Sequence, residues 1–194
     1  MLAVTGSAAS IVNLINCYLN CTNNTGVTFS AASSSAAINI RNCSGDLGTT
    51  GIGLFAHTST GSINVFNSDF TNSGGSSTAT TASAGGFNTV NARFQFPITL
   101  SSTNASTFEY SLFSTSPQNV TALTLNGASH SCKWCRFDSG SASSVSIGSS
   151  AAMMEICTVS SSNTNALTGA GSLSYSFISF DGSSSGVNTS TLVP

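Results

Sequence analysis

The chain has 194 residues, a formal net charge of -2, 5% charged residues and 40% apolar residues. Ample apolar content with little charge excludes a disordered chain, and four Lys and Arg residues in total exclude the electrostatic attraction on which nucleic-acid binding depends. No run of about 18 apolar residues predicts a membrane span. The three prolines and the lack of a Pro/Gly-rich linker predict one continuous domain, residues 1–194.

An imperfect repeat runs through the whole chain. Its copies are marked by small residues spaced 19 to 26 positions apart, about 23 on average. These anchors are Cys17, Cys43, Ser68, Ala92, Ser111, Cys135, Cys157 and Ser176. Short apolar clusters separated by stretches rich in Gly, Ser, Thr and Asn give each copy two or three short strands, and no window has a sustained helical period. The pattern predicts an all-β fold, a β-solenoid of about eight rungs.

Two columns of the repeat are expected to form the core. Two residues after the anchors lie Leu19, Gly45, Phe70, Phe94, Phe113, Phe137, Val159 and Ile178. Three residues before them lie Leu14, Ile40, Val65, Thr89, Phe108, Cys132, Met154 and Leu173. Because equivalent residues of stacked rungs lie about 4.8 Å apart, the four consecutive Phe residues are expected to form an internal aromatic stack.

A corner is expected directly before each anchor, where Asn16, Asn42, Asn67 and Asn91 are followed in later copies by Tyr110, Trp134, Ile156 and Tyr175. Asn tolerates the left-handed conformation that a tight corner needs. Alternation along the preceding strand places this column on the inward side, so no exposed aromatic cluster is expected. Glu109, Lys133 and Glu155, two residues before the anchors, and Asp69 and Arg93, one residue after them, are expected to form solvent-facing ladders of alternating sign.

The small anchors, stacked Phe, corner Asn and rung length resemble the right-handed parallel β-helix family that includes pectin-lyase-like enzymes and phage tailspikes. Residues 143–148 and 155–175 resemble repeats of phage fibre and appendage proteins and of large bacterial surface proteins. This resemblance implies a right-handed, single-stranded parallel β-helix with rungs of roughly 19–26 residues. It also implies a virion fibre or surface rod, often a homotrimer.

Cysteine chemistry is the first candidate activity. Cys132 and Cys135 have the spacing of a redox or metal motif, and with His130 and Cys157 they would supply four zinc ligands. We favour buried thiols that fill tight inner corners, where other rungs use Ser and Ala. A Cys17–Cys43 or Cys135–Cys157 disulfide is not expected, because side chains in register lie about 4.8 Å apart, beyond the usual Cβ separation of about 3.8 Å. We expect free thiols and synthesis in a reducing cytoplasm.

Glycoside hydrolysis is the second candidate activity, because it needs two carboxylates about 5–9.5 Å apart. Glu109 and Glu155 would lie about 9.6 Å apart, with Lys133 between them. A lysine there keeps both glutamates ionised, whereas a general acid needs a raised pKa. The chain has no Asp cluster for a calcium-dependent lyase, and His57 is expected at the rim of its rung.

The sequence thus predicts a non-enzymatic structural or adhesive rod, a component of a phage virion fibre, spike or appendage. A polysaccharide depolymerase of the tailspike type and a bacterial surface adhesin are the alternatives. We assign no catalytic, cofactor-binding or metal-binding residue. The expected partners are further copies of the chain, other fibre segments and a cell-surface glycan, and the expected location is the virion or the extracellular surface. Because no capping helix covers the strand edges at either end, we expect a segment of a longer or oligomeric fibre.

Overall fold

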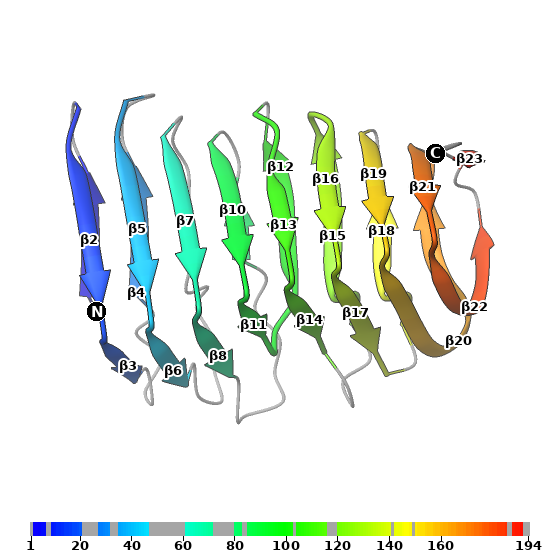
Figure 1. Ribbon diagram of the computed structural model, residues 1–194, viewed down its shortest axis with the longest axis horizontal. Helices are drawn as coiled ribbons and strands as arrows, with labels where there is room; N and C mark the ends of the chain where they lie inside the picture. The colour runs from blue at the N-terminus through cyan, green and yellow to red at the C-terminus, as the bar shows by residue number, and fades with distance from the viewer. Residues whose placement is uncertain are drawn as a thin grey trace.

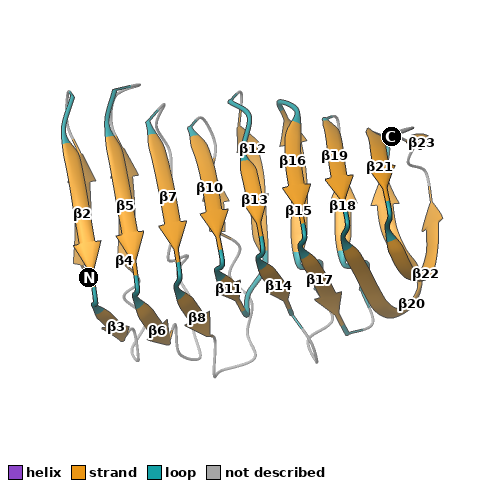
Figure 2. Ribbon diagram, viewed as in Figure 1, coloured by secondary structure: helices purple, strands orange, loops and turns teal. Residues whose placement is uncertain are grey.

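The computed structural model describes residues 2–6, 9–20, 27–31, 35–46, 61–71, 80–82, 85–102, 104–115, 120–140, 142–148, 150–185 and 188–191. These residues form an all-β parallel β-solenoid of about 5 turns, with three parallel sheets and no helix. Successive turns lie side by side along the long axis, from blue to red in Figure 1, and Figure 2 shows strands and connecting loops only. No described segment is a helix able to cross a membrane. The predicted β-solenoid is confirmed, whereas its right-handed sense and its eight rungs stay predictions.

Each sheet collects equivalent strands of successive turns. The nine-stranded sheet contains, in spatial order, β2 (Ile11–Ile15), β5 (Ala37–Arg41), β7 (Ser62–Phe66), β10 (Gly86–Val90), β13 (Thr107–Glu109), β16 (His130–Lys133), β19 (Ala151–Glu155), β21 (Ser172–Ser176) and β23 (Asn188–Thr191). The two-stranded sheet contains β1 (Leu2–Gly6) and β4 (Val27–Ala31).

The twelve-stranded sheet covers two faces of the solenoid. It runs through β3 (Tyr18–Asn20), β6 (Ser44–Asp46), β8 (Asp69–Thr71), β11 (Arg93–Phe94), β14 (Leu112–Ser114) and β17 (Arg136–Ser139) to the long β20 (Thr158–Gly169), with which β22 (Ser179–Ser185) pairs. It returns through β18 (Val145–Ile147), β15 (Leu123–Gly127), β12 (Ile98–Ser102) and β9 (Thr80–Ala82). The start of β20 pairs with β17 and its end pairs with β18, so one sheet continues around the rod.

The register of the nine-stranded sheet confirms most of the predicted repeat. The parallel pairs are Leu14–Ile40, Ile40–Val65, Val65–Thr89, Thr89–Phe108, Phe108–Cys132 and Cys132–Met154. These are consecutive members of the column three residues before the anchors, and all except the half-buried Leu14 are buried. The anchors Cys17 to Cys157 therefore occupy equivalent positions.

The prediction for the last copy is wrong by two residues. Met154 pairs with Tyr175 rather than Leu173, and Val159 pairs with Phe180 rather than Ile178. The corner residue of this copy is accordingly Phe177, which has a φ of 50°, and not Tyr175. A shift of two residues leaves the alternation of inward and outward side chains unchanged, so hydrophobic pattern alone does not detect it.

The predicted phenylalanine stack is confirmed. Phe70, Phe94, Phe113 and Phe137 are fully buried, and their neighbouring ring centroids lie 6.0, 5.3 and 5.5 Å apart at interplanar angles of 21°, 20° and 17°. Phe108 packs edge-on against Phe113 from the nine-stranded sheet. The stack therefore joins four consecutive turns through the interior of the solenoid.

Gly45 is the exception in the stacked column, and close packing explains it. A Cβ atom added at Gly45 would lie 2.5 Å from the backbone oxygen of Leu19 and 3.2 Å from the ring of Phe70. The neighbouring turns already fill the space that a larger residue would occupy. Of the other predicted positions, His57 lies outside the described residues.

Truncating the stack should destabilise the fold. We expect Phe113→Ala to lower the free energy of unfolding by about 3–5 kcal/mol, because it leaves a cavity between two buried rings. Urea denaturation would measure the change, with Tyr18→Ala as the control because Tyr18 is 66% exposed. A Phe113→Ala variant as stable as the control would contradict this interior.

Candidate functional site at the exposed corner

Eight described residues adopt a left-handed backbone conformation where the nine-stranded sheet bends into the twelve-stranded sheet. The φ values lie between 47° and 56° for Asn16, Asn42, Asn67, Asn91, Tyr110, Trp134, Ile156 and Phe177. We call these residues the corner column. All of them are exposed, so the prediction that this column faces inward is wrong. The preceding strand ends one residue earlier, and the left-handed residue breaks the alternation on which that prediction rested.

The side chains of the serine anchors form hydrogen bonds with backbone N–H and carbonyl groups next to the corner. Ser68 Oγ accepts a hydrogen bond from the backbone N–H of Cys43 at 3.1 Å and donates to the carbonyl of Phe66 at 2.7 Å. Ser111 Oγ makes the equivalent contacts to Ala92 and Glu109 at 3.3 and 2.8 Å. A buried N–H without a partner would destabilise the fold, which explains the small hydrogen-bonding side chains in this column.

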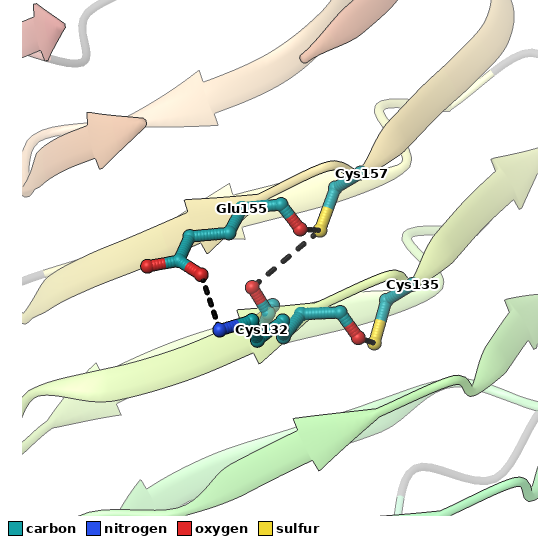
Figure 3. Close-up of polar contacts among 5 residues, drawn as sticks. Cys132, Cys135, Glu155 and Cys157 are labelled. Atoms are coloured by element: carbon teal, nitrogen blue, oxygen red, sulfur yellow. Dashed lines mark hydrogen bonds and ion pairs between the residues drawn. The ribbon is translucent and has the colours of Figure 1, made fainter. Parts of the chain in front are cut away.

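The cysteine anchors Cys135 and Cys157 also form hydrogen bonds with backbone groups at the corner. Cys135 Sγ donates to the carbonyls of Lys133 and Phe108 at 3.4 and 3.3 Å, and Cys157 Sγ donates to those of Glu155 and Cys132 at 3.3 and 3.5 Å. Figure 3 shows the contacts among the labelled residues. These contacts support the interpretation that the buried thiols fill tight positions at the inner side of the corner.

The four residues considered as zinc ligands are buried. His130, Cys132, Cys135 and Cys157 are all at most 3% exposed. Among the described residues, no group of three or more His, Cys, Asp or Glu side chains could hold a metal ion. Burial raises the pKa of Cys132 well above its ordinary value, which disfavours the thiolate that metal binding or nucleophilic attack would need. The five described cysteines are free thiols.

The predicted charge ladders are present beside the corner. Lys133 Nζ lies 2.7 Å from Glu155 Oε2, and Arg93 Nη1 lies 3.4 Å from Asp69 Oδ2. Glu109 is the strand partner of Lys133 on its other side. The hydrogen bond and charge of Glu155 raise the pKa of Lys133, so the lysine stays protonated at neutral pH. The two glutamates therefore flank a permanent positive charge.

The corner column changes character halfway along the rod. Its first four members are asparagines, whereas Tyr110, Trp134, Ile156 and Phe177 are 53%, 39%, 48% and 76% exposed. The rings of Tyr110 and Trp134 are stacked with centroids 4.7 Å apart and planes 7° apart. Lys133 Nζ lies 4.8 Å from the Trp134 ring centroid. We call these four residues the apolar corner.

A groove of about 500 Å³ lies along the asparagine half of the column. It is lined by Asn42, Asn67, Asn91 and their neighbours in the twelve-stranded sheet, and it ends at Tyr110. Groove and apolar corner therefore meet at this tyrosine. Neither was predicted, because the column was assigned to the interior.

Sequence reasoning also missed a surface ladder of side-chain amides. Asn39, Asn64 and Asn88 each donate a hydrogen bond of 2.9 Å to the asparagine of the preceding turn, beginning at Asn13. The signal was visible as an Asn four residues before four consecutive anchors. The ladder lies on the outer face of the nine-stranded sheet, and each bond joins neighbouring turns.

In comparisons with protein-family models, curated proteins and solved structures, nothing was found that matches this chain.

Exchanging corner residues should change stability in a predictable direction. A β-branched residue in the left-handed region is strained by about 1–3 kcal/mol, whereas Asn tolerates it. We expect Ile156→Asn to raise the free energy of unfolding by about 1 kcal/mol, and the reciprocal Asn16→Ile to lower it by a similar amount. Urea denaturation of both variants tests the assignment, and destabilisation by Ile156→Asn would contradict it.

Buried His130 should make stability depend on pH. It is 2% exposed, its Nε2 lies 3.3 Å from the backbone oxygen of Asn126, and its Nδ1 has no partner among the described residues. Burial lowers the pKa of His130, so the neutral form is favoured in the folded state. Its stabilising contribution is therefore complete above the unfolded pKa of about 6.5 and is lost as the pH falls through the lower folded value.

Urea denaturation between pH 8 and pH 5 would measure this effect as a fall in the free energy of unfolding. The fall should be smaller in His130→Gln, which cannot be protonated. Equal pH dependence of the two proteins would rule out His130 as the cause.

Proposed function

We propose that this chain is a non-enzymatic structural and adhesive rod, a segment of a phage virion fibre, spike or comparable surface appendage. In this proposal the solenoid is right-handed, has about eight rungs, and associates with further copies, as in a homotrimer, and with other fibre segments. The parallel hydrogen-bonded sheets and the buried Phe70–Phe137 stack support the structural part, because they couple successive turns into a stiff body.

The apolar corner is the observation that carries the adhesive part. Of the eight exposed large apolar side chains among the described residues, four stand in this one column, at consecutive turns. Each of these four residues stands at a position where other turns have asparagine. Compared with asparagine, it adds both backbone strain and exposed apolar surface. Because strain and exposed apolar area both disfavour the folded state, we infer that these side chains serve to contact another surface rather than to stabilise the fold.

The charge arrangement favours binding over hydrolysis. Glu109 and Glu155 lie on strands separated by the strand that carries Lys133, about 9.6 Å apart at the spacing of neighbouring strands. That separation is at the upper limit for an inverting glycosidase, and Lys133, on the strand between the two glutamates, is ion-paired with Glu155 at 2.7 Å. These features support our proposal of a non-enzymatic rod, and the experiment below distinguishes it from the alternative of a depolymerase.

The free thiols support synthesis in a reducing cytoplasm before assembly at the virion or cell surface. A bacterial surface adhesin would use the same solenoid and the same corner.

Adhesion can be tested by co-sedimentation of the purified chain with a panel of bacterial envelopes. The test variant carries Tyr110→Asn, Trp134→Asn, Ile156→Asn and Phe177→Asn, which keeps the residue type that the corner uses in other turns. We expect it to retain its circular dichroism spectrum and to lose envelope binding by about tenfold or more, because burial of each apolar side chain contributes to affinity.

The matched control replaces the four exposed apolar residues outside the column, Ile11, Ile15, Tyr18 and Met153, by Thr. It should bind like the parent protein. Equal binding by the corner variant would contradict the adhesive role. Release of oligosaccharide from the envelopes, abolished by Glu109→Gln or Glu155→Gln, would establish a depolymerase instead.

A further inference from the structure

The groove beside the corner has the size of a ligand site. Its volume of about 500 Å³ falls within the range of about 300–1,000 Å³ that is typical of small-molecule sites. It extends along the rod axis across consecutive turns, because Asn42, Asn67 and Asn91 are equivalent residues of neighbouring turns. An extended ligand parallel to the axis would meet the same groups repeatedly.

The charge of the groove favours a neutral ligand. Asp69 and Arg93 are the charged residues of its lining, and they form an ion pair with each other at 3.4 Å. The remaining lining residues are Asn, Ser, Cys, Ala, Tyr and Leu. A phosphate, a nucleic acid or a strongly acidic peptide would find no net positive charge here.

The asparagines offer paired donors and acceptors. Asn91 Nδ2 donates a hydrogen bond to Asn67 Oδ1 at 3.1 Å. Among the described residues, Asn67 Nδ2, Asn91 Oδ1 and both polar atoms of the Asn42 side chain have no hydrogen-bond partner. A carboxamide presents a donor and an acceptor side by side. Repeated at the spacing of about 4.8 Å between strands, these groups match a ligand that carries many hydroxyls.

Tyr110 closes the groove with an aromatic face. Trp134, on the next turn, covers one face of its ring. Because the turn of Asn91 lies on the other side of Tyr110 and both residues line the groove, we infer that the opposite face of the ring borders the groove. The two rings are nearly parallel, with planes 7° apart. Hydroxyl-rich molecules that also have an apolar face suited to an aromatic ring are saccharides, whose axial C–H groups gather on one side of the pyranose ring.

We propose that the groove from Asn42 to Tyr110 binds a neutral oligosaccharide. The sugar chain lies along the rod axis, one pyranose ring packs on the free face of Tyr110, and the asparagine amides bind the hydroxyls of the sugars beyond it. This inference rests on the proposed adhesive function and assigns its ligand class, and it adds a binding surface that continues from the apolar corner.

Isothermal titration calorimetry with maltohexaose, cellohexaose and mannohexaose tests the inference, with hexagalacturonate as the anionic comparison. At least one neutral hexasaccharide should bind, and bind more tightly than hexagalacturonate. Tyr110→Asn should weaken binding about threefold to tenfold, because it removes an aromatic face while keeping a residue that the corner accepts. Asn67→Gly, which keeps the left-handed conformation and removes the amide, should also weaken binding. Tyr18→Ala is the control, because Tyr18 is not one of the residues that line the groove, and this variant should bind like the parent protein.

The outcomes separate this inference from the proposed function. Absence of binding by all three neutral hexasaccharides, tighter binding of hexagalacturonate, or unchanged affinity of Tyr110→Asn would overturn the saccharide groove. Adhesion to bacterial envelopes that depends on the apolar corner would still support the adhesive rod in each of those cases. Conversely, hexasaccharide binding by a protein that does not adhere to envelopes would support the groove and contradict the adhesive function.

Discussion

The left-handed residue at the corner between the nine-stranded and the twelve-stranded sheet is the constraint on which the other features depend. It ends the strand of the nine-stranded sheet, redirects the chain and leaves the backbone in place to hydrogen-bond with the next turn, as Asn16 N–H does with the carbonyl of Arg41 at 3.0 Å. The next residue is the anchor, which is small from Cys17 to Cys157. The hydroxyl or thiol of Cys43, Ser68 and Ser111 accepts a hydrogen bond from the backbone N–H of the anchor in the preceding turn. The large residue two positions after the anchor follows inside, which builds the phenylalanine stack.

The buried residues could be predicted from the sequence because they recur at regular positions in the repeat. The anchors and Phe70, Phe94, Phe113 and Phe137 recur with the strand alternation, so their burial follows from the pattern. The corner was assigned to the wrong side because its backbone conformation interrupts that alternation, although Asn in four copies already indicated a left-handed residue. The last turn was misplaced because Leu173 and Tyr175 are two apart and both apolar, so either satisfies the pattern.

The surface differs along the rod even though the backbone repeats. The first four residues of the corner column are asparagines, which suit the left-handed conformation and can hydrogen-bond with water or ligand hydroxyls. The last four are aromatic and aliphatic residues with similar φ values. This separation of the column into a polar and an apolar half places the groove and the apolar corner next to each other, with Tyr110 shared between them. The residues considered for catalysis are not part of this surface. Cys132, Cys135 and Cys157 are buried, and Glu155 forms an ion pair with Lys133.

The most direct test of this account uses Trp134, the only tryptophan of the chain. The exposed corner predicts that native Trp134, 39% exposed and stacked on Tyr110, is quenched efficiently by acrylamide. It also predicts that quenching increases in Tyr110→Asn, which removes the covering ring. A blue-shifted emission spectrum that acrylamide does not quench in the native protein would place Trp134 in the interior, as strand alternation alone suggests, and would contradict the exposed corner.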